Sequence, residues 1–129
     1  MPSSKPSKNT GKHSNSKASK MNPDSKLRRF RGVVMPYAGH SSIRAVKRAG
    51  HEPSIHGTKL WKSSCLIIDY LKKNPPKRRK RVLDAGCGWG ITGIWCAKHW
   101  DSKVISMDAD AAVFPYLDAV AELNGVSTK

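Results

Sequence analysis

The chain has 129 residues, with 24 Lys or Arg, 9 Asp or Glu and a formal net charge of +15. This length allows one small domain, and no apolar run reaches the roughly 20 residues that cross a bilayer, so we expect a soluble protein. Three cysteines without a C-x-x-C pair predict neither a disulfide framework nor a metal site. We therefore expect reduced thiols and a cytoplasmic protein.

Positive charge is concentrated in the first two thirds of the chain. Residues 1–81 hold 21 of the 24 basic residues and 3 of the 9 acidic ones. Residues 1–31 hold nine basic residues, many serines and few large apolar side chains, so folding them would bury too little apolar surface. We predict a disordered basic tail over 1–31 and a single domain over 32–129.

The tail and a second basic run, residues 77–81, are of the kind that attracts polyanions. No aromatic residues interleave either cluster in the sequence, so solvated surface is the simpler interpretation. A non-catalytic protein that binds RNA or another anion through these clusters stays one functional alternative.

After the tail, hydrophobic periodicity and helix-ending residues predict alternating elements. In chain order these are helices over 42–50 and 58–73, a strand over 82–85, a helix over 91–100, a strand over 104–108, and a helix over 111–124. The first strand is a short apolar run of the kind expected in a buried strand. Strand, helix and strand over this distance form a βαβ unit, so we expect the two strands to be parallel.

A glycine-rich turn, DAGCGWG over residues 84–90, lies between the first strand and the next helix. Alternate glycines let a ligand approach the bare backbone near a helix N-terminus. Asp108 ends the second strand 22 residues after Gly86, where a carboxylate can accept both hydroxyls of a ribose. Both features predict a ligand that carries a nucleoside. A second frame over 88–93 fits G-x-G-x-x-G, so an NAD-binding Rossmann protein is the other alternative.

Residues 82–90 resemble the first motif of class I S-adenosylmethionine-dependent methyltransferases, and residues 107–125 are similar to the second strand and following helix of that family. The resemblance covers about residues 56–126. It implies an α/β fold, a Rossmann-like parallel βαβ with N-terminal helices over 42–73 and an incomplete seven-stranded sheet. It also implies S-adenosylmethionine as cofactor, bound by a βαβα unit over 82–126. The implied cofactor-binding residues are Trp61, Asp84, Gly86, Cys87, Gly88, Trp89, Gly90, Asp108 and Ala109.

Residues 56–61, HGTKLW, are similar to the Gly-x-x-x-Trp segment of the lysine-methyltransferase-like branch. By this resemblance Trp61 lies beside the cofactor. The alternative places Trp61 in the core, on the buried face of its helix.

The resemblance implies methyl transfer to a protein or small-molecule acceptor, with most of the acceleration coming from alignment of donor and acceptor. In the family, the residues that face the methyl acceptor follow a later strand. We therefore assign no catalytic residue in this sequence. The two predicted strands would also leave unpaired edges. We therefore expect a fragment of a longer enzyme, inactive alone. The alternatives are a chain completed by a second polypeptide or by self-association, and a remnant without activity.

Overall fold

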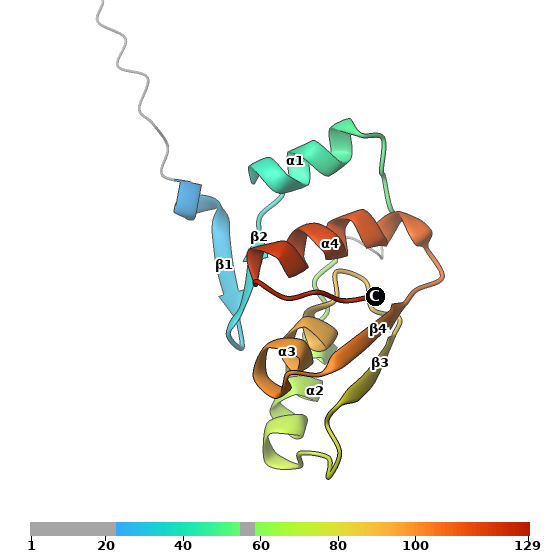
Figure 1. Cartoon of the computed structure of the whole chain (residues 1–129). Helices are drawn as coiled ribbons and strands as arrows, with labels where there is room; N and C mark the ends of the chain where they lie inside the picture. The colour runs from blue at the N-terminus through green and yellow to red at the C-terminus, as the bar shows by residue number, and fades with distance from the viewer. Residues whose placement is uncertain (1–22, 55–58) are drawn as a thin grey trace, which may run out of the picture.

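The computed structural model describes residues 23–54 and 59–129 (Figure 1). None of the helices in these two ranges is long and apolar enough to cross a membrane. The elements, in chain order, are η1 (Pro23–Lys26), β1 (Leu27–Phe30), β2 (Val33–Pro36), α1 (Ser41–Arg48), α2 (Lys62–Lys73), β3 (Arg81–Ala85), α3 (Ile91–Trp100), β4 (Lys103–Met107), η2 (Ala111–Val113) and α4 (Phe114–Leu123).

The centre of the fold is a parallel pair of strands. β3 and β4 pair in parallel, with Leu83 opposite Ile105, and α3 connects them. α3 packs on both strands and α2 packs on α3 (Figure 1). The predicted βαβ unit is confirmed, and the arrangement is part of a Rossmann-like α/β fold.

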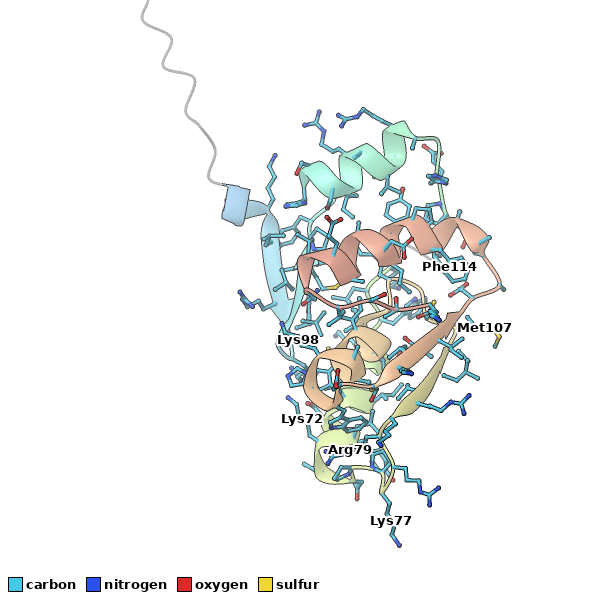
Figure 2. All side chains as sticks on the ribbon, in the orientation of Figure 1. Lys72, Lys77, Arg79, Lys98, Met107 and Phe114 are labelled. Atoms are coloured by element: carbon cyan, nitrogen blue, oxygen red, sulfur yellow. The ribbon has the colours of Figure 1, made fainter. Side chains whose placement is uncertain are left out.

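The opposite face of this sheet is open, which corrects the expectation of a buried first strand. Val104 faces α3 and is 3% exposed, whereas Leu83 and Ile105 on the other face are 62% and 54% exposed. Met107 also points away from the molecule (Figure 2). The apolar run predicts strand structure correctly, but within the described residues no helix covers that face.

The outer edge of β4 is not wholly unpaired. The Lys129 N–H donates to the Val104 carbonyl at 3.0 Å, and the Ser106 N–H donates to the Lys129 carbonyl at 2.6 Å. This is the hydrogen-bond pattern of a parallel neighbour. Both outer edges were predicted to be open. On the β4 edge, Val104 and Ser106 are instead paired with the backbone of Lys129.

An antiparallel hairpin near the N-terminus was missed. β1 and β2 pair with Phe30 opposite Val33, so Arg31 and Gly32 form a two-residue turn. Both have positive φ, 51° and 88°, as a type I′ turn requires. The predicted tail is thus wrong for residues 23–31, while residues 1–22 lie outside the described residues. Three arginines in five residues hid the strand, because charge suggested solvation.

The hairpin belongs to the hydrophobic core. Val33 and Met35 are completely buried and pack in one cluster with residues of α2, α3 and α4. Asn124, just after α4, pairs its side-chain amide with both peptide groups of Val34, each at 2.8 Å. Its amide therefore replaces a neighbouring strand at one position of β2.

The remaining elements follow the prediction closely. α2 begins at Lys62 instead of residue 58, because Trp61 has an extended ψ of 129°. Residues 55–58 lie outside the described residues. The last predicted helix is divided into η2 and α4, and it ends before Gly125, whose φ of 65° suits a C-terminal cap.

Candidate functional site

The glycine-rich turn follows β3 directly and leads into α3. Gly86, Gly88 and Gly90 all have positive φ, between 50° and 76°, which only glycine adopts without strain. The N–H groups of Gly86 and Cys87 both donate to the Met107 carbonyl, at 2.7 and 3.0 Å. The turn is therefore fixed to the end of β4.

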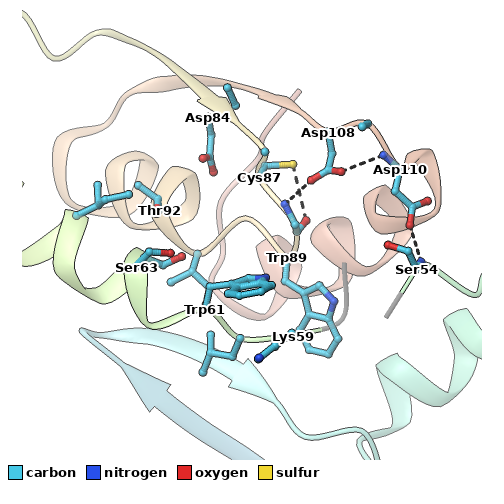
Figure 3. A pocket seen from close by; sticks show the side chains of 18 of the residues that line it. Ser54, Lys59, Trp61, Ser63, Asp84, Cys87, Trp89, Thr92, Asp108 and Asp110 are labelled. Carbon is cyan, nitrogen blue, oxygen red and sulfur yellow. Dashed lines mark hydrogen bonds between the residues drawn. The ribbon is translucent and has the colours of Figure 1, made fainter. Parts of the chain in front are cut away.

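Asp108 lies next to the turn, as the spacing predicts. One carboxylate oxygen accepts the Gly88 N–H at 2.9 Å, and the other accepts the Asp110 N–H at 3.0 Å (Figure 3). A carboxylate oxygen can accept about two hydrogen bonds. Each oxygen of Asp108 therefore keeps capacity for a ligand hydroxyl.

A second carboxylate, that of Asp84 in β3, lies against the first turn of α3. It accepts the Gly93 N–H at 3.0 Å. Burial raises the pKa of Asp84, the Gly93 hydrogen bond opposes that rise, and the charge of Asp108 adds to it. A Cβ on Gly93 would lie 2.9 Å from an Asp84 oxygen and 2.8 Å from Val104, so a glycine is required there.

Trp61 forms the opposite wall of the site. Its indole is 46% exposed, and the Lys59 ammonium lies 4.6 Å from the ring centroid. Trp61 therefore does not have the core position that the alternative interpretation gave it. Trp89 stacks on Tyr116 with ring centroids 5.7 Å apart. In the described part of the chain, the buried indole N–H of Trp89 has no hydrogen-bond partner.

These groups enclose a cavity of about 590 Å³, a size typical of small-molecule sites. Eight of the nine predicted site residues line it: Trp61, Asp84, Gly86, Cys87, Gly88, Trp89, Asp108 and Ala109. Gly90 does not line it. A Cβ on Gly90 would lie 2.8 Å from Leu117, so close packing also requires a glycine at this position.

Sequence reasoning missed several lining residues. Asp110 accepts the Ser54 N–H at 2.6 Å and the Ala112 N–H at 3.0 Å, and these bonds, Ser54 first, lower its pKa. The first bond ties the loop before α2 to the end of β4. Asp110 lies only two residues after Asp108, and this spacing could have indicated Asp110 as a lining residue. Met35 lines the cavity from the hairpin, and nothing in a segment adjoining the predicted tail suggested that.

Cys87 is a buried free thiol that lines the cavity. Burial, then the charges of Asp84 and Asp108, raise its pKa to about 11. The thiolate is the reactive form, so Cys87 is unreactive at neutral pH. Among the described residues no cluster of His, Cys, Asp or Glu could hold a metal ion.

The polar groups of the site distinguish between ligand classes. The N–H groups of the turn and first helical turn donate within the protein at Gly86, Cys87, Gly88, Gly90 and Gly93. Dinucleotides need such N–H groups free for their pyrophosphate. Three carboxylates also line the cavity, at positions 84, 108 and 110, together with one cation, Lys59. The site thus favours a nucleoside that carries positive charge over a polyanion.

A parallel βαβ unit, a turn whose glycine N–H groups donate within the protein, and a carboxylate after the second strand define a Rossmann-like domain of the class I methyltransferase type. Residues 53–129 match the family model described as the methyltransferase small domain. The chain belongs to this family.

Similar curated proteins are methyltransferases. The chain is 33% identical to a ribosomal protein L11 methyltransferase of Prochlorococcus marinus over 76 residues, 59% of this chain and 25% of that protein. It is 42% identical to protein arginine N-methyltransferase 1 of Saccharomyces cerevisiae over 50 residues, 39% of this chain and 14% of that protein. The chain thus spans a quarter or less of these relatives. No solved structure matches it.

Proposed function

We propose that this chain is the cofactor-binding half of an S-adenosylmethionine-dependent methyltransferase. The observation that carries the proposal is the site's polarity: the glycine N–H groups of the turn donate within the protein, and three carboxylates line the cavity. S-adenosylmethionine brings a ribose, a sulfonium and an ammonium group and has no phosphate. Its bound form would supply an activated methyl group.

The residues take distinct roles in this proposal. Asp108 accepts the ribose hydroxyls, because its oxygens are held by Gly88 and Asp110 and keep acceptor capacity. Asp84 is a partly buried carboxylate without a cationic partner in the described structure, so it complements a cationic ligand. The Trp61 ring, half exposed toward the cavity, offers a face for the cofactor.

The methyl acceptor is proposed to be a protein. Both kinds of relative carry names of protein methyltransferases, one for a ribosomal protein and one for protein arginine. A small-molecule acceptor is the competing case. No described residue is assigned to the acceptor, so we name no catalytic residue.

We further propose that additional polypeptide covers the open face of the sheet, either more of the same chain or a second one. Leu83, Ile105 and Met107 expose more than half of their surface there. Apolar faces of this kind favour association.

Isothermal titration calorimetry with S-adenosylmethionine, S-adenosylhomocysteine and NAD tests the cofactor. We expect both adenosyl ligands to bind and NAD not to bind, because its pyrophosphate would meet three carboxylates and a turn whose glycine N–H groups already donate within the protein. Binding of NAD alone would refute the proposal and support the dinucleotide alternative. Transfer of a tritiated methyl group to ribosomal protein L11, with a set of metabolites as the comparison, tests the acceptor class.

A further inference from the structure

A second concave site lies at the opposite end of β3 and α3 from the cofactor cavity. It is an open groove with the basic run 77–81 on one side and the end of α3 on the other. Lys77 and Arg79 lie at one end of the molecule, away from Met107 and Phe114 (Figure 2). We call it the basic groove, defined by residues 77–81 and 98–101.

Charge in the basic groove is strongly unbalanced. Six cations line it, five from residues 77–81 plus Lys98, against one carboxylate, Asp101. None of these cations forms an ion pair with any residue in the part of the chain that the structure describes. Uncompensated positive charge of this density attracts a polyanion.

The fold also supplies what the sequence around the basic run lacks, an aromatic ring. Trp100, from the last turn of α3, lines the groove, and the Arg79 guanidinium lies 5.7 Å from its ring centroid. Trp95 packs edge-on against Trp100 with centroids 5.1 Å apart, which fixes the ring. Bases stack on aromatic rings and on guanidinium planes.

The basic run is anchored to the sheet. The buried Ser102 hydroxyl donates to the Arg79 carbonyl, and the Lys103 N–H donates to the Lys80 carbonyl at 2.8 Å. On the other side, Lys98 donates to the Gly32 carbonyl in the hairpin turn at 3.1 Å. The bonds to the Arg79 and Lys80 carbonyls hold the backbone of the run in place, so less ordering is needed on binding.

We infer that the basic groove binds single-stranded nucleic acid, with phosphates on the basic run and a base stacked at Trp100 and Arg79. A concave surface fits a flexible strand, whereas a bilayer is flat and a purely acidic peptide makes no use of the aromatic ring. The basic groove and the cofactor cavity lie at opposite ends of β3 and α3. The lengths of these elements, about 13 Å each, separate the two sites. A nucleic acid bound in the basic groove therefore leaves the cofactor cavity free, and the inference does not depend on the proposed function.

Fluorescence anisotropy of labelled oligo(rU) and oligo(dT) with the full chain tests this inference. The groove variant is Arg78→Gln, Lys80→Gln and Arg81→Gln. The matched control, Arg44→Gln, Lys47→Gln and Arg48→Gln, removes the same three charges from exposed positions of α1. Because the rest of the chain is identical in both, the difference between them reports the groove.

We expect the groove variant to lower affinity and to flatten the dependence of log K on log salt by about 2, since each lost phosphate contact contributes about 0.7. The α1 control should behave nearly as wild type. Trp100→Ala should weaken binding about 5- to 150-fold, and Trp100→Phe should restore most of it. Tighter binding of oligo(rU) would identify RNA as the ligand, and tighter binding of oligo(dT) would identify DNA.

Equal loss of affinity in the groove variant and the α1 control would overturn the inference, because only overall charge would then matter. Binding to vesicles of anionic lipid, or to polyglutamate, without binding to either oligonucleotide would overturn it as well. Circular dichroism checks that each variant is folded. Where Trp100→Ala unfolds, the comparison of the two triple variants decides.

Discussion

Replacement of Asp108 by alanine tests the cofactor site most directly. Each Asp108 oxygen already accepts one backbone N–H, from Gly88 at 2.9 Å or from Asp110 at 3.0 Å. The remaining acceptor capacity is about one hydrogen bond per oxygen, which matches two ribose hydroxyls. Hydrogen bonds to a charged group contribute about 1.5–3 kcal/mol each, and water recovers part of this in the variant.

We therefore expect Asp108→Ala to cost about 1–3 kcal/mol of S-adenosylmethionine binding, a rise in Kd of about 5- to 150-fold. Asp108→Asn keeps one oxygen and should fall between alanine and wild type. Asp118→Asn is the matched control, because Asp118 is exposed on α4 and does not line the cavity. Isothermal titration calorimetry gives the four Kd values, for the wild type and the three variants.

A separate measurement distinguishes the structural contribution of Asp108 from its ligand contact. Without the carboxylate, the Gly88 and Asp110 amides lose their acceptor, so hydrogen exchange at both should accelerate in Asp108→Ala without any ligand. Accelerated exchange with an unchanged Kd would refute the assignment of Asp108 to the ribose while leaving the geometry of the turn intact.

Three further predictions address other parts of the molecule. Asn124→Ala should destabilise the hairpin by about 2 kcal/mol, because both peptide groups of Val34 lose a partner, and hydrogen exchange at the Val34 amide should accelerate; Asn124→Asp, which keeps the acceptor alone, should lie between. Burial raises the pKa of Asp84, so its ionisation costs stability as pH rises from about 4 through the raised pKa. Asp84→Asn should abolish that loss in thermal melts recorded across this range, and an unchanged pH profile would contradict the burial argument. Leu83→Lys, on the open face of the sheet, should reduce self-association in sedimentation velocity, and an unaltered distribution would show that this face does not associate.

The βαβ unit could be predicted because local pattern and tertiary structure agree there. Helical spacing placed Ile91, Ile94 and Trp95 on one face of α3, and all three are buried. The glycine turn follows the first strand of the unit and Asp108 follows the second, so the spacing between them indicates one site. Their proximity could be predicted because parallel strands have their carboxyl ends at the same edge of the sheet.

The hairpin could not be predicted from pattern, because its stability comes from distant contacts. Arg28 and Arg29 suggest solvent, yet β2 is buried by α3 and α4, and the Arg31 guanidinium pairs with Asp69 of α2 through two hydrogen bonds of 2.7 Å. Charge composition therefore masked a core element. The aromatic side of the basic groove was missed for the same reason, since Trp100 is remote in sequence from the basic run.

The pairing of Asn124 with Val34 joins residues 90 positions apart, and this has a consequence for synthesis on the ribosome. At roughly 5–20 residues per second, about 5 to 20 seconds separate the appearance of β2 from that of its amide partner. The hairpin is made first, yet its packing is complete only after α4 exists. During that interval Val33 and Met35, which are fully buried in the folded protein, have α2 and α3 but not α4 to cover them.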